Sequence, residues 1–131
     1  MASGIVTARA NTHLDADLAA TVYAALFTAD PTDAGLATNE VTDANAYART
    51  AIVFGDAAAS RTIDNSAACE FPVCTGSTWG TVTHLMIVAA ATRGVADGWY
   101  YGELTASKVV GVGDQLVFAE GNVDVTFSAG A

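Results

Sequence analysis

The sequence predicts a mainly β domain: an antiparallel β-sandwich or open barrel of about seven or eight strands, with a short N-terminal helix. Three observations support this prediction. Short runs rich in β-branched and aromatic residues recur between turns of glycine, aspartate, asparagine and proline. The last run, residues 123–127, alternates apolar and polar side chains. Strands and helices do not alternate as a parallel sheet would require.

The helix is predicted near residues 12–20. Thr12 followed by Asp15 resembles a capping box with aspartate in place of the usual glutamate. Leu14 and Leu18 then recur at helical spacing. We therefore expect Thr12 to cap the first turn of this helix.

The length of 131 residues fits one domain. Residues 1–11 are expected to form an extended N-terminal arm that carries Arg9, one of the few positive charges. Residues 12–131 are expected to form a single β-rich domain that includes the short helix.

The expected strands are separated by turn signals along the rest of the chain. They cover residues 21–28, 50–55, 62–63, 67–73, 79–90, 99–104, 115–119 and 123–127. In the strand at 79–90, one face would carry Val82, His84, Met86 and Val88. The opposite face is also apolar, so both sides of this strand are expected to be covered.

The charge balance excludes two classes of partner. The chain has 14 acidic against 5 basic residues, a formal net charge of −9, and no cluster of lysine or arginine. Binding to nucleic acid or to an anionic membrane surface requires such a cluster, so neither partner is expected. There is no signal-peptide pattern and no apolar run long enough to span a membrane. The chain is therefore expected to be made in the cytoplasm and to be soluble there.

No motif predicts catalysis, a cofactor or a metal site, so the chain is not expected to be an enzyme. Cys69 and Cys74 are expected to be free thiols, with a local disulfide as the alternative. A zinc site formed by these cysteines and His84 is a weaker alternative. The acidic residues show no calcium-loop pattern and are more typical of turns and of a solvated surface.

The aromatic residues are the remaining binding candidates. Trp79, Trp99, Tyr100 and Tyr101 would suit sugar stacking, but core packing and subunit contact are the favoured interpretation. Neighbouring residues on a strand face opposite ways, so Tyr100 is expected to point away from Trp99 and Tyr101.

Five stretches, in order along the chain, together resemble small structural proteins of tailed-bacteriophage virions. They are residues 24–35, 46–55, 79–85, 100–108 and 113–118. Members of this group are labelled head-decoration (cement), head-fibre or tail-fibre-like proteins. The resemblance spans most of residues 21–127 and implies a β-sandwich-like domain that is repeated as a small ring in a virion. The chain departs from the pattern after Leu85, where residues 86–91 are wholly apolar.

The resemblance and the composition together favour a capsid decoration protein on the outer surface of the virion. It is expected to be a homotrimer that clamps the major capsid protein, with affinity from buried apolar surface. A tail-associated or fibre-associated component is the first alternative, and a carbohydrate-binding module is the second. The residues expected to form contacts are Arg9, Tyr47, Arg49, Trp79 and Tyr100, with Tyr47 and Arg49 acting as a structural or interface pair.

Overall fold

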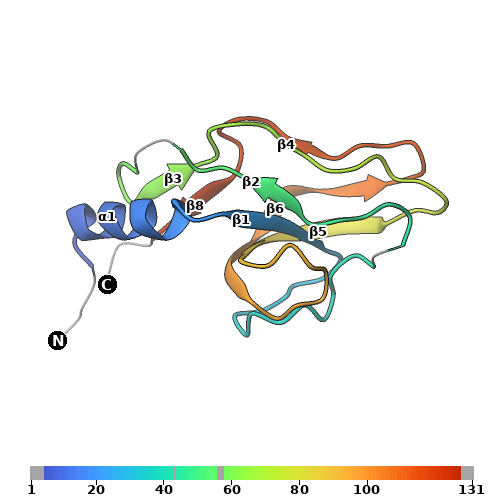
Figure 1. Ribbon diagram of the computed structural model, residues 1–131, viewed down its shortest axis with the longest axis horizontal. Coiled ribbons are helices and arrows are strands. Elements are labelled where there is room, and N and C mark those ends of the chain that lie inside the picture. The colour runs from blue at the N-terminus through green and yellow to red at the C-terminus, as the bar shows by residue number, and fades with distance from the viewer. Residues whose placement is uncertain (1–4, 43, 56–57, 128–131) are drawn as a thin grey trace.

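The computed structural model describes residues 5–42, 44–55 and 58–127 (Figure 1). These residues form one helix and eight strands, and every strand pairing is antiparallel, which confirms the predicted mainly β fold. The elements are α1 (Thr7–Leu18), β1 (Val22–Phe27), β2 (Thr50–Ile52), β3 (Thr62–Asp64), β4 (Cys69–Glu70), β5 (Gly80–Val88), β6 (Gly98–Val110), β7 (Val117–Phe118) and β8 (Asp124–Thr126).

The strands form an open barrel. One layer is a four-stranded sheet in the order β2-β1-β5-β6. The other is a long ribbon in which β3 pairs with β8 and β4 pairs with β7. The layers are joined on the β2 side, where Ser66 N donates to Val53 O at 2.8 Å. On the other side, β5 is the only strand partner of β6 among the described residues, so the barrel is open between β6 and the segment that carries β7 and β8.

The core follows the alternation of the strands. From β1, Ala24 and Leu26 point into the barrel, while Ala25 and Phe27 point to the opposite face of the sheet. Both sets are buried, because the ribbon covers the inner face and connecting loops cover part of the outer face. The strand at 80–88 is likewise apolar on both faces, as expected.

The prediction for Val82 is wrong. Val82 belongs to the inner core with Leu85, whereas Met86 and Val88 lie on the outer face. The register between β5 and β6 shifts between Val82 and His84, and such a bulge reverses the alternation of side chains along a strand. The same irregularity lets pairing resume with Lys108, so β6 continues to Val110, beyond the predicted end at 104.

The prediction of an extended arm over residues 1–11 is wrong from residue 7 onward, because α1 begins at Thr7. The Thr12 hydroxyl does not cap the helix but donates to Ala8 O, one turn back, at 2.9 Å. Alanine and arginine in residues 7–10 are strong helix formers, and they extend the helix towards the N-terminus. Residues 1–4 of the predicted arm lie outside the described residues.

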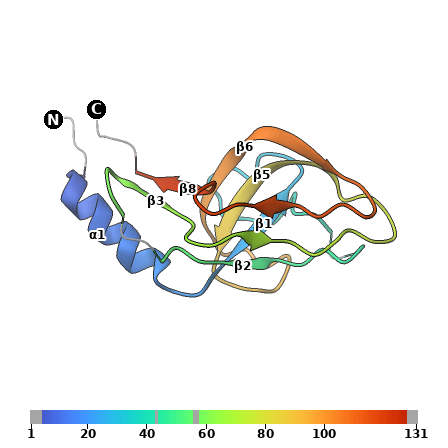
Figure 2. The same ribbon diagram turned by 90° about the horizontal axis from the view of Figure 1, so that it is seen from above.

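Side chains of α1 attach the helix to one end of the barrel, beside β3 and β8 (Figures 1 and 2). Asn11 Oδ1 accepts from Arg61 N at 2.9 Å, and Asp15 Oδ1 accepts from Ala58 N at 2.7 Å. Ser60 and Arg61 have positive φ angles of 51° and 65°, which cost free energy in residues other than glycine. The helix therefore stabilises a strained turn of the barrel while it buries Leu14 and Leu18.

Candidate functional site

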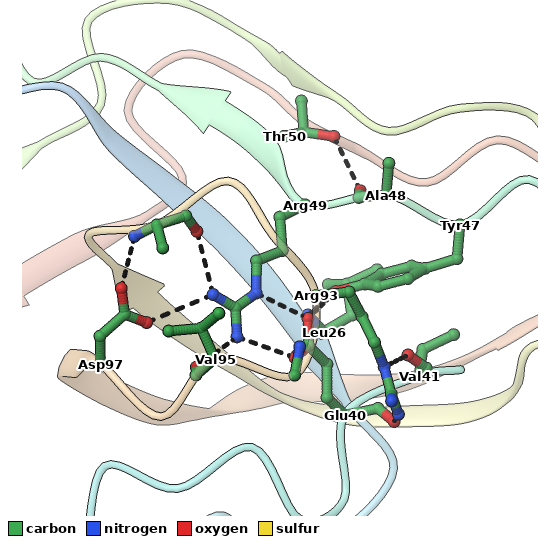
Figure 3. Close-up of polar contacts among 12 residues, drawn as sticks. Leu26, Glu40, Val41, Tyr47, Ala48, Arg49, Thr50, Arg93, Val95 and Asp97 are labelled. Atoms are coloured by element: carbon green, nitrogen blue, oxygen red, sulfur yellow. Dashed lines mark hydrogen bonds and ion pairs between the residues drawn. The ribbon is translucent and has the colours of Figure 1, made fainter. Parts of the chain in front are cut away.

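The most extensive polar cluster in the described residues lies beneath the loops that follow β1 and β5, and Figure 3 shows its contacts. We call it the ionic cluster: Glu40, Tyr47, Arg49, Arg93 and Asp97. Glu40 is 4% exposed and Arg49 is 6% exposed. Glu40 reaches this position because its segment pairs with the end of β1, where Val41 N donates to Leu26 O at 2.9 Å.

Arg49 uses all five of its guanidinium N–H donors. Nε and Nη2 donate to the two carboxylate oxygens of Glu40, each at 2.9 Å. Nη1 donates to Ala90 O at 2.9 Å and to Asp97 at 3.3 Å, and Nη2 also donates to Val95 O at 2.8 Å. Burial disfavours the charged guanidinium, but Glu40 and Asp97 outweigh that effect and raise the pKa of Arg49 above its ordinary value.

Glu40 is equally well satisfied. It accepts from the Tyr47 hydroxyl at 2.8 Å and from Gly94 N at 3.0 Å. Tyr47 in turn accepts from Leu26 N at 3.1 Å, on the edge of β1. Burial, and then the negative charge of Glu40, raise the pKa of the Tyr47 hydroxyl above its ordinary range. Because these groups are buried and bonded to one another, the cluster holds two loops in place and presents no reactive group to a substrate.

The two cysteine thiols lie in the interior of the domain. Cys69 and Cys74 are free and buried. Burial raises the pKa of the Cys69 thiol to about 11, which keeps it protonated and unreactive near neutral pH. Within the described part of the chain, no three His, Cys, Asp or Glu side chains are grouped so that they could hold a metal ion.

An open groove runs along the side where the barrel does not close. We call it the seam, and its volume is about 950 Å³. Its first wall is β6, and its second wall is the chain from Leu116 to Thr126, which includes β7 and β8. Trp99, Tyr100 and Tyr101 line the seam at the start of β6. The other apolar lining residues are Leu85, Ile87, Leu104, Ala106, Leu116, Val117, Phe118, Val123 and Val125. Three charged residues line it: Glu103, Lys108 and Asp124.

The aromatic residues at the start of β6 alternate as predicted. Tyr100 packs against the inner core and donates its hydroxyl hydrogen to Asp17 on α1 at 2.6 Å. Burial, followed by this contact with Asp17, raises the pKa of the Tyr100 hydroxyl above its ordinary range. Trp99 and Tyr101 point the other way and are 41% and 47% exposed. They are the largest exposed side chains on β6.

The residues that were expected to form contacts with partner proteins fall into two groups, some buried and some accessible. Tyr47, Arg49 and Trp79 are buried, so in this conformation they act inside the domain and not at its surface. Trp79 packs edge-on against Tyr47 and donates Nε1–H to Asn45 O at 2.9 Å. Arg9 is exposed on α1, and Tyr100 lines the seam. Glu40 and Asp97, the two carboxylates that bind Arg49, were not among the residues predicted from the sequence to form contacts.

The described surface is acidic. Of the five basic residues, only Arg9 and Lys108 are exposed, while most of the described carboxylates are exposed. Among the described residues, no helix combines the length and the apolar character needed to cross a membrane.

A comparison with protein families completes the description of the site. Residues 9–126 match the family model described as "Podophage GP4 fiber I protein gp80". The chain belongs to this family of podophage fibre proteins. The family confirms the resemblance to small virion structural proteins and makes the chain a bacteriophage virion structural component. No curated protein matches the chain.

Proposed function

We propose that this chain is a structural subunit of a podophage fibre and works by holding other virion proteins, without catalysis. The observation that carries the proposal is the family match, which extends over residues 9–126 and so includes nearly all of the barrel. The geometry is consistent with such a role. The buried ionisable groups of the ionic cluster are hydrogen-bonded to one another. The exposed features are a groove and, beside it, a strand that is paired on one side only.

Capsid decoration is the second candidate. It is favoured by the acidic surface, which suits the outside of a shell better than a position against packaged DNA. In this case the major capsid protein would be the partner and a homotrimer the expected assembly. For either role we propose an external position on the virion, with neither nucleic acid nor membrane as a partner.

The number of copies per virion separates the two candidates. Quantitative mass spectrometry of purified virions would measure this chain relative to the major capsid protein. A fibre subunit is expected in a small number of copies, whereas a decoration protein would approach the copy number of the shell subunit. A ratio near that of the shell would overturn the fibre proposal, and absence from purified virions would overturn both.

A further inference from the structure

We propose that the seam binds an extended, basic polypeptide segment of another virion protein, which adds as a strand beside β6. This inference names the kind of partner and the mode of contact, and it does not depend on whether the chain belongs to a fibre or to the shell. The first observation is the unused edge. β6 has thirteen residues, and β5 is its strand partner on one side only. β7 and β8, on the opposite wall, are each paired on one side as well.

The edge of β6 next to the seam has little protection against strand addition. Natural edge strands are commonly blunted by proline, by inward-pointing charges, by bulges or by short length. The pairing of β6 with β5 is irregular between Glu103 and Lys108 and again between Gly98 and Tyr100, so the regular part is residues 100–103, which has no proline and a single charge. The regular part of the edge is therefore a template for a short added strand.

The size of the seam agrees with one strand. From the rise along a strand, the spacing between strands and the spacing between sheets, one strand residue fills roughly 160 Å³. The volume of about 950 Å³ then holds about six residues, enough for a strand beside residues 98–103, of which 100–103 are regularly paired. Most of the aliphatic residues that line the seam are buried or half-buried, and its three charged residues are exposed, which suits a segment with apolar side chains at every second position.

Charge determines which segment fits. Glu103 on β6 and Asp124 on β8 place a carboxylate on each wall, and Lys108 is the one cation that lines the seam. A second copy of this chain, with its net charge of −9, is disfavoured as the occupant of the seam, because it would place further negative charge beside these carboxylates. A basic segment from a different protein is attracted instead. Two rows of free backbone groups also favour a polypeptide over a glycan, because only a strand matches their spacing.

The test uses the purified full chain and nuclear magnetic resonance of its backbone amides. The probe is the synthetic peptide Lys-Val-Thr-Val-Lys-Val-Thr-Lys, and the control peptide has proline in place of its second and third valines. Strand addition predicts that amides of residues 98–103 and of β8 shift and exchange more slowly with solvent when the probe is added. The proline peptide is expected to leave them unchanged, because proline cannot donate to a strand.

A matched pair of variants tests the role of charge. Glu103→Lys is expected to weaken binding of the probe about two- to fivefold, as expected for the loss of an exposed ion pair. Glu70→Lys makes the same change on β4, where the side chain does not itself line the seam although its strand partner Val117 does, and is expected to change the affinity less than Glu103→Lys. Equal effects of the two variants would overturn the proposed charge selection.

Three results would overturn the proposed occupant. The first is that the resonances of the seam amides stay unchanged when the probe is added. The second is that they shift with protein concentration alone, which would assign the seam to a second copy. The third is that they respond to maltohexaose and not to the peptide, which would assign the seam to a glycan. None of these results depends on the copy number in virions, so the fibre proposal stands or fails separately.

Discussion

At the scale of single residues, the fold depends on how completely Arg49 is satisfied. Its five donors meet acceptors from two segments of the chain, Glu40 after β1 and the loop between β5 and β6, and Glu40 is also buried. A buried ion pair contributes little net stability compared with an apolar replacement of both partners. Loss of one partner is a different matter, because it leaves a buried charge without compensation.

We therefore expect Arg49→Met to lower the free energy of unfolding by about 3–5 kcal/mol. The double variant Glu40→Gln with Arg49→Met is expected to lose less, because it also removes the stranded carboxylate. Urea unfolding followed by circular dichroism measures both. Arg9→Met, on the exposed face of α1, is the control and is expected to stay within about 0.5 kcal/mol of the parent. A single variant no less stable than the double would contradict this account of the cluster.

The buried Cys69 thiol predicts a loss of stability in alkali. Its pKa is about 11 in the folded protein against an ordinary value of 9.0, so the unfolded chain releases its proton first as the pH rises. The contribution is therefore complete below pH 9 and is lost between pH 9 and 11, by about 2–3 kcal/mol. Tyr47 and Tyr100, whose pKa values are also raised, act in the same direction at higher pH.

Urea unfolding at a series of pH values from 8 to 11 tests this contribution. Cys69→Ala is expected to show a shallower decline than the parent protein over that range, whatever its stability at pH 7. If stability falls with pH equally in the two proteins, the pKa of the Cys69 thiol is not raised by folding, which would contradict this prediction.

Among the elements, α1 does not begin at the capping-box motif that the sequence suggested. Thr12 and Asp15 have the spacing of a capping box, yet Asp15 caps a turn of the barrel at Ala58 and Thr12 lies inside the helix. We expect Thr12→Ala to raise the free energy of unfolding by a few tenths of a kcal/mol, since alanine is the better helix former. A loss of about 1 kcal/mol, typical of a removed cap, would restore the original prediction.

Its neighbour Asn11 is the matched comparison. Asn11→Ala removes the acceptor for Arg61 N, in a turn with positive φ angles, and is expected to cost about 1–2 kcal/mol. Thermal or urea unfolding of the two alanine variants would check that their changes in the free energy of unfolding have opposite signs.

Strand β6 offers a second matched pair. A Cβ atom at Gly98 would lie 2.2 Å from Met86 Sδ and 3.2 Å from Gly35 Cα, whereas a Cβ atom at Gly102 would meet nothing within 4 Å. Gly98→Ala is therefore expected to cost about 1–3 kcal/mol through overpacking. Gly102→Ala is expected to be neutral or to stabilise by up to about 1 kcal/mol. Equal unfolding midpoints in urea would mean that the loop carrying Gly35 moves freely away from the sheet.

For the whole molecule, local sequence patterns predicted the type of fold and the direction of some side chains, but not how strands that are distant in the sequence pair. Turn residues and alternation were enough to predict a β-rich fold and the opposite directions of Tyr100 and Trp99. They did not predict the face of Val82, because the bulge in β5 follows from pairing with β6. Similarly, Tyr47 and Arg49 were selected as a pair, but their partner Glu40 is brought to them by pairing with β1.

The seam could not be predicted from the sequence either. Each strand beside it has an ordinary strand composition, and only the closure of the barrel on the β2 side leaves β6 and the β7–β8 strand unpaired on the other. Whether an edge is free is therefore a property of the assembled barrel and not of any one strand. The same holds for the surface charge, since burial of Arg49 removes one of the five basic residues from the surface.

We propose that this barrel is a fibre subunit of the virion. The most direct measurement is an electron cryo-microscopy reconstruction, without imposed symmetry, of the phage that carries the chain. The claim predicts the barrel in a few copies within a fibre, with a neighbouring chain in contact with β6. Barrels distributed regularly over the faces of the shell, or their absence from the particle, would contradict it.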